Sequence, residues 1–237
     1  MSAESASAKL YVERDHRYVH HYTVSLITKR VFDIVIATLG LVVAAPLFAV
    51  IAIAIKRDSP GPVFFKQVRV GKKRRLFAMW KFRKMPHELP EQGPMLTARD
   101  DGRLTRVGYW LERTKLDELP QLLNVLASEM SVVGPRPEVT KFVDRATPEL
   151  WDQALSVKPG IFGANQIRYR NEADLYPEDC EDLEAYYLRH ILPAKLEVDA
   201  EYAQRCNVPR DVWLLVRGVG ATLLCRPAGA RDEQEGR

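Results

Sequence analysis

The stretch Val31–Ile55, VFDIVIATLGLVVAAPLFAVIAIAI, decides the fold of this chain because almost every residue in it is apolar. At about 1.5 Å of rise per residue, a straight helix of about 25 residues is long enough to cross a bilayer. The run starts far from the N-terminus for a secretory signal, and charged residues follow it at Lys56 and Arg57 in place of a small-residue cleavage site. The sequence therefore predicts a membrane-associated helix.

Pro46 interrupts the apolar run near its middle. Proline has no N–H for the carbonyl of Val42 and its ring crowds the preceding turn, so we expect a kink. A helix bent there can return to its own side as a re-entrant element, but transmembrane helices also tolerate proline, so a kinked crossing stays open. The basic pairs Lys29–Arg30 and Lys56–Arg57 flank both ends and favour neither orientation. A re-entrant element would hold both pairs at one anionic leaflet.

Asp33 is an acid inside this apolar run. Two interpretations are open. An aspartate in the first turn of a helix interacts favourably with the helix dipole, whereas a specific partner such as a nearby arginine would make it a buried contact.

Composition and charge indicate one compact domain of 237 residues, with 46% hydrophobic and 28% charged residues. Basic residues concentrate in 57–83 and 99–115 and acids in 172–201, so the first half favours an anionic partner. We expect no nucleic-acid partner, and a homo-oligomer is left open. Three widely spaced cysteines, Cys180, Cys206 and Cys225, indicate neither a disulfide framework nor a zinc site. A reducing cytosolic environment is the simplest interpretation.

A β-hairpin is predicted directly after the apolar segment. Pro60–Pro62 marks a turn, and Val63–Val70 and Leu76–Phe82 read as two strands around the basic tip GKKRR. This tip either contacts phosphates of lipid or diphosphate or is simply a solvated turn. Lys81 and Arg83 flank Phe82, and strand alternation would aim both toward one face, where they could form an anion cradle.

The adjacent carboxylates Asp117 and Glu118 follow a short amphipathic helix predicted over 103–113. Thr114 with Asp117 three residues later could be a capping box, which would make Asp117 structural. However, that cap would place Pro120 in a helix interior, so we expect the helix to start at or just before Glu118. The two carboxylates would then lie at a helix N-terminus, where anions such as a phosphoryl group are stabilised.

Adjacent carboxylates suit phosphoryl transfer better than glycoside hydrolysis. A glycosidase places its two carboxyls on opposite sides of a bond, which neighbours on one backbone do poorly. In phosphoryl transfer, one carboxylate can attack phosphorus while the other holds Mg²⁺, which needs only one or two protein carboxylates. Arg113 and Arg136 would give forked hydrogen-bond donors to the phosphates.

The C-terminal part has a helical pattern over 172–201 and a second apolar helix over 211–224. The latter fits a helix lying in the membrane interface, and a core or subunit-contact helix fits almost as well. For Asp199, within this helical stretch, a salt-bridged structural role is at least as good an explanation as a functional one. The tail 226–237 is predicted to be disordered.

Several motifs in joint order and spacing resemble the bacterial sugar transferase family, the monotopic phosphoglycosyl transferases. The resemblance covers nearly the whole chain beyond about residue 28. The matching segments are Lys29–Asp33, Pro60–Phe65, Lys81–Arg83, Thr105–Gly108, Leu116–Asn124, Ser131–Pro137 and Lys158–Ile161.

This resemblance implies transfer of a sugar 1-phosphate from a UDP-sugar to undecaprenyl phosphate, with release of UMP, as the first membrane step of surface glycan or exopolysaccharide synthesis. Asp117 would be the nucleophile that carries the phosphosugar, and Glu118 would be its partner at Mg²⁺. The implied phosphate-binding residues are Lys81, Arg113, Arg136 and, less directly, Arg170. Pro46 would be the hinge of a re-entrant helix-break-helix element, although Ala45 replaces a serine common before it.

The predicted fold class is therefore α+β: a monotopic membrane protein with a re-entrant anchor, interfacial amphipathic helices and a small β-hairpin. The predicted organisation is a cytosolic tail (1–28), the re-entrant membrane helix (29–57), a catalytic domain (58–225) and the disordered tail. The protein would lie at the cytoplasmic face of the bacterial inner membrane and contact anionic lipid. Two rival functions remain: a membrane-attached nucleotide-sugar diphosphate hydrolase and a noncatalytic scaffold that binds anionic lipid.

Overall fold

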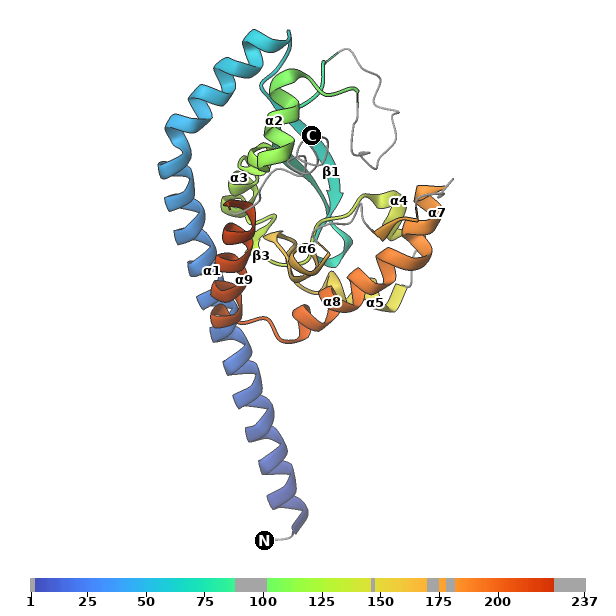
Figure 1. The fold of residues 1–237 in the computed structure, drawn as a ribbon. Helices are drawn as coiled ribbons and strands as arrows, with labels where there is room; N and C mark the ends of the chain where they lie inside the picture. Colours follow the sequence, from blue (N-terminus) through green and yellow to red (C-terminus); the bar gives the residue numbers. More distant parts are fainter. Residues whose placement is uncertain (1–2, 88–101, 146–147, 170–174, 178–181, 224–237) are drawn as a thin grey trace, which may run out of the picture.

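A computed structural model describes residues 3–87, 102–145, 148–169, 175–177 and 182–223, with side chains described between Leu26 and Thr222 (Figure 1). The predicted mixture of helices and small sheets is confirmed. The elements are α1 (Ala3–Asp58), β1 (Phe64–Val70), η1 (Lys72–Arg74), β2 (Leu76–Phe82), α2 (Arg106–Thr114), η2 (Leu116–Glu118), α3 (Gln121–Leu126), β3 (Ser131–Val133), α4 (Thr140–Val143), α5 (Pro148–Ala154), β4 (Gly160–Phe162), α6 (Ala164–Arg168), α7 (Leu183–Tyr186), η4 (Tyr187–Ile191), α8 (Leu192–Gln204) and α9 (Val208–Leu223). The predicted tail 226–237 lies outside the described residues.

The helix α1 contains the predicted membrane segment and extends from Ala3 to Asp58, so residues 3–28 continue the same helix. Its part Leu26–Asp58 contains an 18-residue window with a mean hydropathy of 2.7, and within the described residues it is the one helix long and apolar enough to cross a membrane. The helix stays continuous through Pro46. It runs along one side of the molecule and changes direction in its second half (Figure 1).

A buried set of polar contacts fixes the start of the apolar segment to the rest of the protein. Lys29 Nζ donates to the Val133 carbonyl oxygen at 3.0 Å and to Asp211 Oδ2 at 2.5 Å. Asp211 also accepts from the Tyr202 hydroxyl at 2.6 Å. One turn along α1, Asp33 accepts from Ser131 Oγ at 2.8 Å and from the Val132 N–H at 3.0 Å. We call the side chains of Lys29, Asp33, Tyr202 and Asp211 the anchor clamp.

The first basic pair, Lys29 and Arg30, has partners within the protein. Lys29 is only 9% exposed, and Arg30 donates to the carbonyl oxygens of Val125 and Leu126 at 2.7 and 3.0 Å. Lys29 is therefore buried against Asp211, and the half-buried Arg30 binds the last carbonyls of α3, which need donors. Asp33 has a specific partner, but that partner is β3 and not an arginine.

The predicted β-hairpin is confirmed. Strands β1 and β2 pair antiparallel from Phe64 opposite Phe82 to Val70 opposite Leu76. At the tip, Lys73 and Arg74 have left-handed φ angles of 55° and 60°, and Arg74 forms an ion pair with Asp152 at 3.1 Å. The hairpin therefore reaches α5, which begins at Pro148.

A second, parallel pair of short strands supports the loop that carries Arg136. Ser131 pairs with Gly160 and Val133 with Phe162. A Cβ on Gly160 would lie 2.0 Å from the Gly134 nitrogen, so the two backbones approach as only glycine allows. The Gly160 N–H donates to the Pro135 carbonyl at 2.8 Å, which fixes the loop directly before Arg136.

Apolar side chains form three clusters around this frame. One joins the β1 end to α4, α5 and α8; a second lies under β3 between α1, β2 and α9; the third joins the second half of α1 to β2 and α2. Helix α9 lies beside α1 (Figure 1) and buries Leu214 while it leaves Trp213 and Val216 exposed. Large apolar residues along α1, including Val42 and Val43, are also exposed. Large apolar side chains exposed in this number are typical of a surface that contacts a membrane or another protein.

Candidate active site

The two carboxylates lie in the short 3₁₀ turn η2, between α2 and α3. Lys115, at the start of this turn, has a left-handed φ of 58°, and α3 begins only at Gln121 with Pro120 as its N-cap. The prediction that the helix starts at or just before Glu118 is therefore wrong by about one turn. A 3₁₀ turn replaces the first turn of α-helix and is followed by proline at the helix boundary, where its missing N–H costs nothing.

The capping-box alternative for Asp117 is also wrong. The Thr114 hydroxyl donates back to the carbonyl oxygens of Trp110 and Leu111 at 2.9 and 3.3 Å. It is part of the end of α2 and does not cap the next helix. Asp117 nevertheless is only 2% exposed, so its carboxylate is buried without a capping role.

Glu118 is held by two cations from different elements. Arg136 Nη2 donates to Glu118 Oε1 at 2.9 Å and Lys81 Nζ donates to the same oxygen at 3.2 Å. Burial favours the neutral acid, but Arg136 and Lys81 outweigh it and hold the pKa of Glu118 well below its usual range. Glu118 in turn raises the pKa of Arg136. Both groups are therefore charged at neutral pH.

Asp117 has looser contacts than its neighbour. Its Oδ2 lies 3.5 Å from Lys84 Nζ and 4.0 Å from Lys81 Nζ, which is longer than an ordinary hydrogen bond. Burial raises the pKa of Asp117, and Lys81 opposes this only in part because the charge of Glu118 adds to the increase. Lys84 also contacts Glu112 at 3.2 Å. The Asp117 carboxylate thus lies in a cationic pocket, but neither of its two neighbouring lysines is within ordinary hydrogen-bond distance.

The structure places the other predicted residues as follows. Lys81 reaches the carboxylates, but Arg83 donates to the carbonyl oxygens of Ser59 and Pro60, so the predicted cradle of Lys81 and Arg83 is wrong. The strand β2 ends at Phe82, and alternation no longer governs the next residue. Arg113 donates to the Tyr109 hydroxyl at 2.6 Å on its own helix, and its phosphate-binding role stays a prediction. Arg170 lies outside the described residues.

Two cations near the site were missed by sequence reasoning. Lys84 contacts Asp117. The sequence did not predict this contact because Lys84 lies beyond the end of β2 and three residues after Lys81, so strand alternation does not place the two side chains on one face. Arg69 donates to the Pro137 carbonyl at 3.2 Å and lies 3.7 Å from Glu138, so it supports the Arg136 loop from β1. Its sequence signals were its position in the basic stretch before the hairpin tip and its place among the residues that resemble the sugar transferase family, but neither predicted this contact.

Asp199 lies apart from these carboxylates and has a structural environment. It is only 4% exposed and accepts from Asn165 Nδ2 at 2.6 Å. Burial raises its pKa well above the usual range, and Lys195 opposes this shift. Within the described part of the chain, Asp199 accepts a hydrogen bond from an amide, and the predicted salt bridge is not formed.

The carboxylate turn can hold anions and offers the ligand type that Mg²⁺ prefers. Lys81, Lys84 and Arg136 surround Asp117 and Glu118, and the N–H groups of these cations that do not contact the carboxylates can bind a phosphate. Within the described residues, no group of three or more His, Cys, Asp or Glu side chains could enclose a metal ion. Mg²⁺ commonly binds through one or two carboxylates together with substrate phosphates, and the carboxylates of this turn fit that arrangement.

Comparison with known families decides what kind of protein this is. The family model described as bacterial sugar transferase matches residues 23–224. The chain belongs to this family. The resemblance read from the sequence is therefore confirmed for almost the full matched length.

Named bacterial sugar transferases are similar to this chain. It is 38% identical over 197 residues to the UDP-glucose:undecaprenyl-phosphate glucose-1-phosphate transferase of Escherichia coli, which covers 81% of this chain and 39% of that protein. It is 43% identical to the undecaprenyl-phosphate glucose phosphotransferase of Komagataeibacter xylinus, covering 86% of this chain and 37% of that protein. A putative undecaprenyl-phosphate N-acetylgalactosaminyl 1-phosphate transferase of Bacillus subtilis is 36% identical over 72% of this chain and 97% of its own length.

The chain thus spans about two fifths of the Escherichia coli and Komagataeibacter xylinus relatives and nearly the full length of the Bacillus subtilis one. These bacterial sugar transferases differ in the sugar of their names, glucose in two and N-acetylgalactosamine in the third.

Proposed function

We propose that this protein transfers a sugar 1-phosphate from a UDP-sugar to undecaprenyl phosphate and releases UMP, as the first membrane step of surface glycan or exopolysaccharide synthesis. The observation that carries the proposal is Asp117, a buried carboxylate beside Glu118 in a pocket of three cations that follows a membrane-length helix. Family membership and the names of the relatives support the donor and the acceptor. The relatives differ in sugar, so the proposal leaves the sugar open.

In the first proposed step, an oxygen of the Asp117 carboxylate attacks the phosphorus that bears the sugar. A bond forms between that oxygen and phosphorus, the bond from phosphorus to the bridging oxygen breaks, and UMP leaves with the electron pair. In the second step, a phosphate oxygen of the acceptor attacks the same phosphorus and the acyl phosphate bond breaks. The Asp117 carboxylate is regenerated, and the product is a polyprenyl diphosphate sugar.

The contacts of Asp117 support its role as nucleophile. Its distances of 3.5 and 4.0 Å to Lys84 and Lys81 leave the oxygens without a tight hydrogen bond, and burial removes water that would otherwise solvate them. A bound diphosphate would draw the charges of Lys81 and Lys84 away from Asp117. That displacement frees the attacking oxygen at the moment the substrate is present.

Glu118 and its cations would bind and orient the donor. Arg136 and Lys81 meet at one oxygen of Glu118, so their remaining N–H groups can bind phosphate oxygens. Glu118 would also be the Mg²⁺ ligand, and the ion would neutralise charge on the diphosphate when bound. Arg113 at the end of α2 and Arg170 would add phosphate contacts in this proposal.

We further propose that α1 is re-entrant and hinged at Pro46, so that the domain lies at the cytoplasmic face of the bacterial inner membrane and contacts anionic lipid. The exposed apolar residues of α1 and of α9 support a monotopic arrangement with α9 in the interface. Cysteines placed at Ser5 and Asp152, in a variant without the three native cysteines, should both resist an impermeant reagent added outside intact cells. Labelling at position 5 alone would instead mean a helix that crosses the membrane.

The proposed chemistry is tested by trapping the intermediate. Wild-type protein mixed with a panel of UDP-sugars in the absence of acceptor should release at most about one UMP per protein and gain the mass of one phosphosugar on the peptide that contains Asp117. Continued UMP release without undecaprenyl phosphate would favour the hydrolase, and no UMP release from any donor would favour the lipid-binding scaffold.

A further inference from the structure

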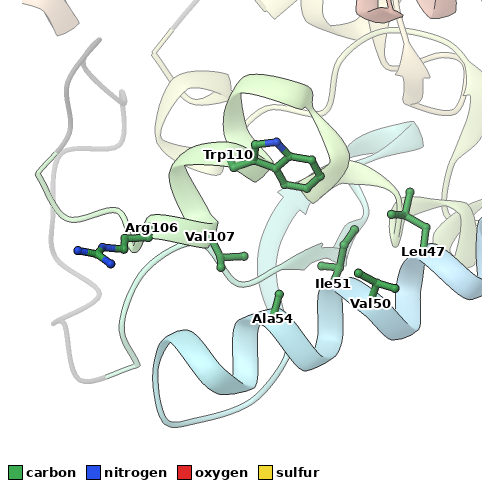
Figure 2. A pocket seen from close by; sticks show the side chains of 7 residues that line it. All are labelled: Leu47, Val50, Ile51, Ala54, Arg106, Val107 and Trp110. Carbon is green, nitrogen blue, oxygen red and sulfur yellow. The ribbon is translucent and has the colours of Figure 1, made fainter.

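An apolar cleft of about 250 Å³ lies between the second half of α1 and helix α2. Figure 2 shows side chains of α1 that face Val107 and Trp110 across this cleft, with Arg106 at its edge and pointing away. The α1 residues of the lining are Leu47, Val50, Ile51 and Ala54. All four follow Pro46, so they lie in the part of the membrane segment beyond the proposed hinge.

The cleft is left open by large apolar side chains that the protein itself does not cover. Val50 is 63% exposed and Trp110 is 50% exposed, although Ile51 beneath them is only 2% exposed. Covering exposed apolar surface is favourable by about 25 cal/mol per Å², and the half-exposed Trp110 does not gain this stabilisation within the protein. A ligand with an apolar chain would cover this surface and bind with that free energy. Because the lining belongs to a membrane-length helix, such a ligand would enter from the bilayer.

The cleft adjoins the carboxylate turn. Arg106, Trp110 and Arg113 follow one another at i, i+4 and i+7, so the cleft wall and the predicted phosphate-binding Arg113 share one stripe of α2. The turn with Asp117 starts two residues after α2 ends. Ile51 of the cleft floor and Leu116 of the carboxylate turn also belong to the same apolar cluster. An apolar chain in the cleft would therefore have one end near Asp117.

We propose that this cleft holds the first isoprene units of the polyprenyl phosphate acceptor and so presents its phosphate to Asp117. This inference rests on the proposed function and adds to it the place where the acceptor chain binds. An ordinary phospholipid could enter the same cleft, but of these membrane molecules only the acceptor must bring its head group to the carboxylates. The position of the cleft beside η2 therefore favours the acceptor.

The test separates the two half-reactions. Val50→Trp fills the cleft, and Val43→Trp is the matched control because Val43 lies on the same helix, is 78% exposed and does not line the cleft. We expect Val50→Trp to form the phosphosugar on Asp117 at the wild-type rate in the absence of acceptor. Its apparent KM for undecaprenyl phosphate should rise about tenfold or more, while the control stays within about twofold of wild type.

A second variant guards against poor insertion of the first. Trp110→Ala removes one wall of the cleft and should also raise the KM for undecaprenyl phosphate, with the donor half-reaction unaffected. Unchanged acceptor KM in both variants, with a normal donor half-reaction, would overturn the cleft assignment and leave the phospholipid as its occupant. Loss of the donor half-reaction in the wild type would instead overturn the proposed function.

Discussion

The carboxylate turn and the anchor clamp are both buried clusters of charge, and they differ in how completely their charges are satisfied. In the clamp, Lys29 and Asp33 each have partners at 3.0 Å or less, and those partners are side chains or backbone groups of β3 and Asp211. In the carboxylate turn, Asp117 is at least as well buried but its nearest cations lie at 3.5 and 4.0 Å. The clamp is complete as it stands, whereas the turn has cationic donors to spare.

This difference separates a structural charge cluster from a ligand site. A closed cluster stabilises only one arrangement of the chain, because every removed partner leaves a buried charge behind. A cluster with excess donors stabilises the protein less and can bind an anion instead. Burial or a shifted pKa alone would not distinguish them, since burial raises the pKa of both Asp117 and Asp211.

Asp117→Asn should give the largest difference between the carboxylate turn and the anchor clamp, because it should abolish activity without loss of stability. Without the attacking carboxylate, transfer should fall by about three orders of magnitude or more, and no phosphosugar should be trapped. Unfolding should not become easier, because burial opposes the charge of Asp117 in the folded protein and the amide carries none. UMP release and thermal unfolding in detergent measure the two effects. A large loss of thermal stability would show that the Asp117 carboxylate stabilises the folded protein and has a structural role.

Lys29→Met should have the opposite effect and lower the stability of the folded protein. It leaves Asp211 buried and unpaired, so we expect a loss of about 3–5 kcal/mol in the free energy of unfolding. The double variant Lys29→Met with Asp211→Leu should recover most of this loss, because Asp211 is then no longer a buried carboxylate without its lysine partner. Denaturant unfolding of both variants measures it. If the double variant were no more stable than the single one, the unpaired Asp211 carboxylate would not be the cause of the lost stability.

Arg136→Lys should lower the rate by about one to two orders of magnitude, because lysine cannot reach Glu118 and a phosphate with a planar fork of donors. Arg145→Lys is the control: Arg145 pairs with Glu184 at 3.0 Å on the surface and should tolerate the change. Steady-state rates with saturating donor compare the two. Equal rates in both variants would remove Arg136 from the phosphate-binding set.

The smallest effect concerns the pH dependence. Burial raises the pKa of Asp117, so the nucleophile loses its charge at a higher pH than an exposed aspartate as the pH falls. Lys84 opposes this increase, and Lys84→Met should therefore move the acid limb of the rate profile to higher pH. Single-turnover phosphosugar formation against pH measures the shift. Movement of the limb to lower pH would contradict Asp117 as the titrating group.

Local patterns predicted the local parts of this protein. The two hairpin strands follow from β-rich runs around a turn and agree with the structure within a residue, and the membrane-length helix follows from composition. The carboxylate pair was found because its two residues are neighbours. What the sequence could not show was which distant groups would meet: Lys84 at Asp117, and Asp33 at the backbone of Val132. Such contacts depend on tertiary packing, which also turned the expected helix start into a 3₁₀ turn.

The separation of Lys29 from Asp211 along the chain imposes an order on how the protein is made. The apolar segment leaves the ribosome and can enter the membrane long before α9, which carries Asp211, has been synthesised. Until then Lys29 lacks the Asp211 carboxylate that it pairs with in the folded protein. Docking of the finished domain onto its membrane helix is therefore a late event. A chain that ends before Val208 should insert normally yet remain sensitive to protease across β3.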